Sequence, residues 1–242
     1  MKKILAVFIA FALLGSAAMA QKPNTLSTKE KKEGWKLLFD GKTTKGWHTY
    51  LRDTVGSRWQ AKDGVIIFDP NGAAAGGGDI VTNEEFENYD FRLEWKISKG
   101  GNSGTIFNIQ EKNEQGYKQT YETGPEMQVL DNIDAQDNKK ENHLAGSLYD
   151  MSGSAAISKP KPVDEWNQVR ILQKNGHLTF WLNGVQTFDG QIGSEEWNKL
   201  VAGSKFGNSR GFPNFAKVAK GKIALQQHPG SSQWRNIKIL PI

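Results

Sequence analysis

The chain has 242 residues, with 8 Trp, 5 Tyr, 12 Phe and 26 Gly but no cysteine. The aromatic content excludes an intrinsically disordered protein. The absence of cysteine excludes disulfides, thiolate metal sites, a cysteine nucleophile and a lipidated-cysteine anchor. The formal net charge is +5, but the sequence contains no basic run interleaved with aromatic residues, so we expect no nucleic-acid partner.

The first twenty residues have the pattern of a secretory signal. Lys2 and Lys3 precede an uninterrupted apolar run over residues 4–14, and residues 18–20 (Ala-Met-Ala) form a small-x-small cleavage site. This run is too short to span a bilayer, and no later segment is long enough, so the sequence predicts no membrane span. We expect residues 1–20 to be removed and the mature protein to be exported; a retained membrane anchor is the alternative.

A polar leader occupies residues 21–33, where Ser27 and Glu30 are spaced to form the capping box of a short solvated helix. Residues 34–242 contain no repeat and no long linker, so we expect one domain there.

Short strands separated by turn residues follow in chain order. Asp63-Gly64 predicts a hairpin between residues 57–62 and 65–68. Residues 91–97 alternate strictly between apolar and polar, as expected for a strand with one buried face.

Two Asn-Gly pairs, at 175–176 and 183–184, predict a β-meander that joins three further runs over residues 169–173, 178–182 and 185–188. A short helix is expected over residues 194–201, with Ser194 as its N-cap. Residues 222–228 and 234–239 have the pattern of closing strands. The whole pattern predicts an all-β fold, a jelly-roll sandwich of two antiparallel sheets.

Polar side chains on the outer face of such a sandwich are the candidate site. Alternation places pairs of polar residues away from the core on three strands, so we expect them to converge in one groove. The pairs are Arg92 with Glu94, Glu126 with Gln128, and Gln226 with His228. For the first pair, an ordinary surface charge ladder is the alternative.

Glu126 is the first candidate for a general base, because it follows Gly124-Pro125 and precedes apolar residues, at the edge of a shielded sheet. The alternative is a carboxylate that binds nearby loop amides. His143 and His228 are the best of the four histidines, because both lie among polar and glycine residues.

Metal and phosphate motifs are not evident. No HExxH spacing occurs, and Asp131, Asp134 and Asp137 do not match an EF-hand loop. The glycine-rich residues 72–78 lack the Gly-Lys-Ser/Thr ending of a phosphate loop. The sequence therefore requires no cofactor, while leaving a divalent metal open.

Seven motifs in order resemble the 3-keto-disaccharide hydrolase family, also described as 3-keto-glucoside lyase/hydratase. They cover residues 34–47, 94–104, 125–132, 145–150, 165–167, 181–184 and 221–237. The resemblance implies a concanavalin-like jelly roll, a substrate that is an oxidised sugar, a periplasmic location in a Gram-negative bacterium, and a pathway link to an oxidoreductase that makes the 3-ketone. Where the family pattern has a histidine after Asp131-Asn132, this chain has Ala135.

The implied reaction begins at C2, because a ketone at C3 acidifies the C2 proton. A base removes that proton, the enolate expels the C1 oxygen, and water then adds to complete a net hydrolysis. We assign catalysis to Glu126, His143 and His228, and expect Glu126 and His143 to share one pocket. The residues expected to contact substrate are Arg92, Glu94, Asn102, Gln128, Tyr149, Lys159 and Gln226, with Arg92 and Lys159 as cationic helpers.

A carbohydrate-binding module that has kept the jelly roll without catalysis is the alternative function, since fold alone does not decide chemistry. That alternative predicts exposed aromatics over a flat groove, and Trp47 and Trp234 are the candidates.

Overall fold

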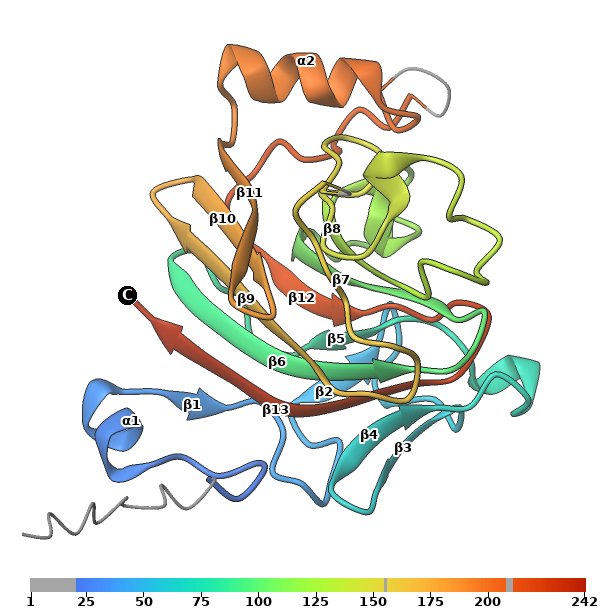
Figure 1. Ribbon diagram of the computed structural model, residues 1–242, viewed down its shortest axis with the longest axis vertical. Helices are drawn as coiled ribbons and strands as arrows, with labels where there is room; N and C mark the ends of the chain where they lie inside the picture. Colours follow the sequence, from blue (N-terminus) through green and yellow to red (C-terminus); the bar gives the residue numbers. More distant parts are fainter. Residues whose placement is uncertain (1–20, 155, 208–210) are drawn as a thin grey trace, which may run out of the picture.

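The computed structural model describes residues 21–154, 156–207 and 211–242; the predicted signal over residues 1–20 lies outside the described residues. Over the described ranges, two antiparallel sheets lie one over the other and helices are few (Figure 1). The predicted all-β sandwich of two antiparallel sheets is confirmed.

The larger sheet has eight strands in the order β11-β10-β9-β6-β13-β4-β3, and β1 pairs with β13 beside this path. Long strands β6 and β13 form its curved centre (Figure 1). Its strands are β1 (Lys36–Leu37), β3 (Trp59–Lys62), β4 (Val65–Phe68), β6 (Tyr89–Ile97), β9 (Asn167–Lys174), β10 (His177–Leu182), β11 (Val185–Gln191) and β13 (Ser232–Pro241).

The smaller sheet has five strands in the order β2-β5-β12-β7-β8. Its members come from distant parts of the chain, which brings the end of β12 beside β7 and β7 beside β8. They are β2 (Trp47–Thr49), β5 (Ile80–Thr82), β7 (Asn102–Ile109), β8 (Glu126–Leu130) and β12 (Lys222–Leu225).

The helices are α1 (Thr28–Glu33), α2 (Glu195–Gly203) and the single-turn 3₁₀ segments η1 (Ala74–Gly76), η2 (Thr120–Glu122) and η3 (Glu141–His143). Both predicted N-caps are confirmed: Ser27 and Glu30 form a capping box, and the Ser194 hydroxyl accepts from the Trp197 amide over 3.1 Å.

All three predicted hairpin turns join paired strands. Asp63-Gly64, Asn175-Gly176 and Asn183-Gly184 have φ values between 51° and 83°. Two successive positive φ angles define the type I′ turn, whose twist matches that of the flanking strands, and Asn-Gly and Asp-Gly tolerate it best. These turns therefore fix the registers of β3 with β4 and of β9, β10 and β11.

The core lies between the two sheets and follows the predicted alternation. Phe91, Leu93, Trp95 and Ile97 on β6 are buried, whereas the residues between them are half-buried. Trp47 and Trp234 are 5 % and 0 % exposed. Neither tryptophan is available as an aromatic platform, so the sign predicted for a non-catalytic sugar-binding module is not found at these positions.

The leader lies along β13. Asn24 and Asn236 exchange two hydrogen bonds, with each backbone amide donating to the other's side-chain oxygen over 2.6 and 2.8 Å. Helix α1 has no buried residue, as expected for a solvated helix, yet its Glu30 pairs with Lys238 of β13. Burial opposes ionisation of Glu30, but the bonds from Lys238 and Ser27 lower its pKa to about 2.

Among the described residues, no helix is both long enough and apolar enough to cross a membrane.

Candidate active site

The outer face of the smaller sheet carries a cavity of about 320 Å³. Asn102 of β7, Glu126 and Gln128 of β8, and Gln226 just after β12 contribute to its lining. The chain between β7 and β9 rises over this part of the sheet (Figure 1). The other lining residues are Gly78, Asp79, Gln119, Tyr121, Tyr149, Lys205, Phe206, Gln227 and His228. The predicted grouping of two of the polar pairs, from β8 and from the end of β12, is therefore confirmed.

Glu126 is buried at the start of β8, with 5 % of its surface exposed. Gly104 of the neighbouring strand makes room for its carboxyl group, because a Cβ at position 104 would lie 1.8 Å from Glu126 Oε1. Gln226 Nε2 donates to Oε2 over 3.2 Å. Burial, and next the negative charge of Asp79, raise the pKa of Glu126 to about 8. A carboxyl group with this pKa exchanges protons readily near neutral pH, as a general acid or base requires.

Asp79 is the second carboxylate of the cavity and directly precedes β5. Thr120 Oγ1 donates to one carboxylate oxygen, and the Gln227 amide donates to the other over 2.7 Å. Burial raises the pKa of Asp79 to about 6, although both hydrogen bonds favour the ionised form. The cavity thus holds two carboxyl groups with raised pKa values about two pH units apart, an arrangement typical of acid–base sites.

Two buried amide atoms in the cavity have no hydrogen-bond partner among the described residues. They are Asn102 Oδ1 and Gln128 Nε2, on residues that are 7 % and 1 % exposed. An unpartnered buried polar atom costs about 1–3 kcal/mol, which a ligand with matching groups would recover. One acceptor and one donor in this position are suited to the hydroxyl and carbonyl groups of a sugar.

Lys205 supplies a positive charge to the cavity wall. Its Nζ donates to the Tyr149 hydroxyl over 2.7 Å, and that hydroxyl donates to Asp137 Oδ2 over 2.7 Å. Nζ also lies 4.2 Å from the centre of the Tyr149 ring. Burial, and next the hydrogen bond to Asp137, raise the pKa of Tyr149, so its hydroxyl stays protonated.

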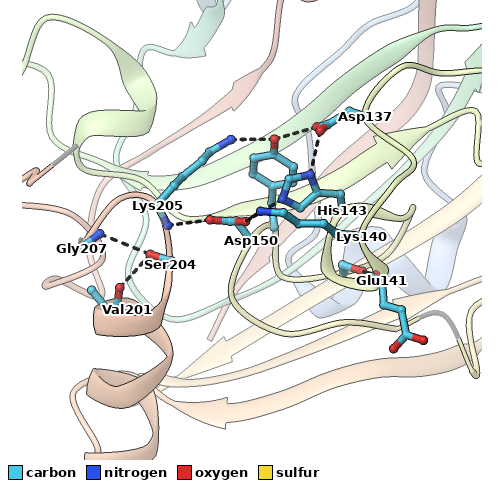
Figure 2. A network of polar contacts seen from close by, with 11 residues as sticks. Asp137, Lys140, Glu141, His143, Asp150, Val201, Ser204, Lys205 and Gly207 are labelled. Carbon is cyan, nitrogen blue, oxygen red and sulfur yellow. Dashed lines mark hydrogen bonds and ion pairs between the residues drawn. The ribbon is translucent and has the colours of Figure 1, made fainter. Parts of the chain in front are cut away.

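His143 lies behind Tyr149 and does not line the cavity. Its Nδ1 is 2.7 Å from Asp137 Oδ1 and its Nε2 is 2.6 Å from Asp150 Oδ1 (Figure 2). The prediction that His143 shares a pocket with Glu126 is therefore wrong. Because carboxylates occupy both ring nitrogens, neither is available for a substrate proton. His143 instead holds the loop that carries Tyr149.

Asp150 closes this network onto the segment after α2. It accepts from the backbone amide of Lys205 over 2.6 Å and from Lys140 Nζ over 3.3 Å (Figure 2). Burial opposes ionisation of Asp150, but the hydrogen bonds from His143, the Lys205 amide and Lys140 lower its pKa. The ionised carboxylate thereby positions the backbone from which the Lys205 side chain reaches the cavity.

His228 lines the rim of the cavity, as predicted, and its side chain is exposed. Partial desolvation lowers its pKa; the charge of Asp137 opposes this effect and that of Lys205 adds to it. Near neutral pH the imidazole is therefore mainly uncharged, the form that accepts a proton.

Arg92 and Glu94 lie on the other sheet, so their predicted convergence with Glu126 is wrong. They come from β6, which pairs with β9 and β13 in the larger sheet. Arg92 forms two hydrogen bonds with Asp90, and Glu94 accepts from Arg235 Nε over 2.7 Å. This is the surface charge ladder that was their alternative interpretation.

Lys159 is also outside the cavity. Its side chain is exposed, and its backbone carbonyl accepts from Asn183 Nδ2 over 3.2 Å. Lys205, rather than Lys159, is the lysine that lines the cavity.

The three aspartates of the loop from Asp131 to Asp137 each bind different partners. Asp131 accepts from the Gly100 amide over 2.7 Å, Asp134 pairs with Lys99, and Asp137 binds Tyr149 and His143 as described. In the part of the chain that the structure describes, no three acidic or histidine side chains gather as metal ligands. Ala135, at the position of the family histidine, is 3 % exposed and belongs to the core.

Sequence reasoning missed Asp79 and Lys205. Asp79 had a usable signal, because it separates a glycine-rich run from a short apolar strand, where side chains reach the end of a sheet. Lys205 had none: it follows α2 by two residues in a polar loop, and only the tertiary fold brings it to Tyr149.

The comparisons with known proteins agree with this architecture. A family model described as 3-keto-alpha-glucoside-1,2-lyase-like domain matches residues 34–240. The chain belongs to this family. A 3-keto-disaccharide hydrolase of Bacteroides thetaiotaomicron is 34 % identical over 227 residues, which cover 86 % of this chain and 78 % of that protein.

Two solved structures of candidate glycosyl hydrolases from Parabacteroides distasonis share the fold. One has a TM-score of 0.81 and 33 % identity, and the match covers 91 % of this chain and 100 % of the other. The second has a TM-score of 0.63 and 25 % identity, with 86 % and 99 % covered. The family and its hydrolase member confirm the resemblance stated above and identify this chain as an enzyme of the hydrolase class.

Proposed function

We propose that this enzyme cleaves the glycosidic bond of 3-keto-glucosides, including 3-keto-disaccharides, by elimination followed by hydration. The observation that carries the proposal is the buried Glu126, with its raised pKa, in a cavity that also presents Lys205 and two unpartnered amide atoms. The name of the Bacteroides thetaiotaomicron relative supports the substrate class.

Elimination starts when the ionised Glu126 takes the proton from C2. The C2–H electron pair moves into the C2–C3 bond and the C3 carbonyl becomes an enolate. We assign stabilisation of the enolate oxygen to Lys205, which lines the cavity, and orientation of the ring to the amides of Asn102 and Gln128. Because burial weakens the acidity of Glu126, its carboxylate is a stronger base than an exposed one.

The enolate then re-forms the ketone and expels the oxygen on C1, which gives a 2-hydroxy-3-keto-glucal and an alcohol. His228, in its protonated form, donates a proton to the departing oxygen from the rim of the cavity. Its lowered pKa makes that form a better acid.

Hydration of the glucal returns Glu126 and His228 to their starting protonation states. Neutral His228 takes a proton from the water that adds to C1, and Glu126 returns its proton to C2. The product is 3-keto-glucose, and the sum of both steps is hydrolysis. The chain's own residues supply the base, the acid and the cation for this route.

The substrate class is tested by incubating the protein with 3-keto-trehalose, 3-keto-sucrose and the unoxidised parents. Release of 3-keto-glucose from the oxidised sugars alone is the expected result. Comparable cleavage of trehalose or sucrose would contradict the proposal, since C2 has no acidic proton without the ketone.

The substrate chemistry also implies a supply reaction. A glucoside gains a C3 ketone when it loses the hydrogen on C3 and the hydrogen of the C3 hydroxyl group, a two-electron oxidation, so we propose an oxidoreductase upstream of this enzyme. We further propose that both reactions take place in the periplasm after removal of residues 1–20. Mass spectrometry of the mature protein should then show Gln21 as its first residue.

A further inference from the structure

A second cavity adjoins the first and shares three of its lining residues, Asn102, Tyr149 and His228. It measures about 580 Å³, within the range of about 300–1,000 Å³ typical of small-molecule sites. Its other lining residues are Gly100, Asp134, Gln136, Asp137 and Pro229. His228 therefore borders both cavities.

The unpartnered Oδ1 of Asn102 is the observation that points to a ligand here. Asn102 is 7 % exposed and lines both cavities, so an acceptor without a partner is held at their junction. A hydroxyl group of a bound molecule would satisfy it. The catalytic assignment places C1 of the substrate near His228, so the group attached to C1 extends into the second cavity.

The chemistry of the second cavity favours a polyhydroxylated group. Asp134 and Gln136 present a carboxylate and an amide, and both side chains are exposed to the cavity and solvent. Asp134 is paired with Lys99 over 3.6 Å, which leaves lone pairs of its carboxylate for hydroxyl donors. Asp137 lines the second cavity, but its carboxylate oxygens are hydrogen-bonded to Tyr149 and His143, so we do not assign it a hydrogen bond to the bound molecule.

We propose that this second cavity is the subsite for the leaving group, that it selects a sugar over an apolar or aromatic group, and that Asp134 and Gln136 determine this specificity. The inference rests on the proposed function, since it takes C1 to be the bond that breaks.

The test compares two substrates with the same oxidised ring. 3-Keto-trehalose has a sugar as its leaving group, and methyl 3-keto-α-glucoside has only a methyl group. We expect the double variant Asp134→Ala/Gln136→Ala to raise KM for 3-keto-trehalose about tenfold, or about 1.4 kcal/mol. For the methyl glucoside, kcat/KM should stay within about twofold.

The control is the double variant Asp53→Ala/Gln186→Ala, which removes the same two types of group at exposed positions that line neither cavity. It should leave both substrates unchanged. Equal effects of the test variant on both substrates, or no effect on either, would overturn the subsite while leaving the proposed function in place. If the wild-type protein cleaves neither 3-keto substrate, the proposed function fails and the subsite fails with it.

Discussion

Glu126→Gln is the most informative single change, because it should affect catalysis and stability in opposite directions. The substitution keeps the shape of the side chain and removes the group that takes the C2 proton. Loss of a general base lowers rates by about 10²–10⁴-fold. Both the release of 3-keto-glucose and the exchange of the C2 hydrogen with heavy water should fall by that factor.

The pH dependence of exchange in the wild-type protein follows from the pKa of about 8 for Glu126. Only the ionised carboxylate is a base, so at pH 6 about 1 % of the enzyme is active in exchange. The exchange rate should rise about tenfold per pH unit up to pH 8 and level off above it.

The effect on stability has the opposite sign. The folded-state pKa of about 8 lies above the ordinary value of 4.5, so the folded protein binds this proton more tightly than the unfolded chain. Stability is therefore lost as the pH rises from about 4.5 to 8, by at most about 5 kcal/mol. A residue that cannot ionise avoids this loss, although its buried amide has a cost of its own. At pH 9 we expect Glu126→Gln to be about 2 kcal/mol more stable than wild type, or about 4–8 °C in Tm.

The assay is proton NMR in heavy water for C2 exchange, with thermal unfolding followed by circular dichroism at pH 5 and pH 9. Glu141→Gln is the matched control, because Glu141 is exposed and its side chain points away from the network (Figure 2). A folded Glu126→Gln protein with near-normal exchange would refute the assignment of the base. Equal stability of variant and wild type at pH 9 would refute the raised pKa.

Three further predictions concern two neighbours of Glu126 and the His143 network behind Tyr149. Asp79→Asn removes the neighbouring negative charge, so the pKa of Glu126 should fall and the midpoint of the pH–exchange profile should move to lower pH; an unchanged or higher midpoint would contradict the coupling. Gly104→Ala puts a Cβ where the Glu126 carboxyl group lies, so kcat should fall at least tenfold while Gly203→Ala, with open space around its Cβ, stays near wild type. His143→Ala leaves two carboxylates without their common partner and should lower the unfolding free energy in urea by about 3 kcal/mol, whereas a loss below 0.5 kcal/mol, in the range of ordinary surface substitutions, would show that the contacts are not stabilising.

The sequence alone determined the local elements. Type I′ turns, helix caps and strict alternation depend on residues within a few positions of each other, so Asp63-Gly64, Ser194 and the strand over residues 91–97 were readable without tertiary information. The same alternation indicated which side of β8 faces the cavity, and so it identified Glu126 and Gln128.

The tertiary structure decided which outward-pointing residues lie on the same face of the molecule. Alternation shows that Arg92 and Glu126 both point away from the core, but it does not show that β6 and β8 belong to different sheets, whose outer faces point in opposite directions. It also does not show burial by loops, which raises the pKa of Glu126, or the pairing that removes His143 from the cavity. These properties come from contacts between residues far apart in the chain, and a pattern of period two carries no information about such contacts.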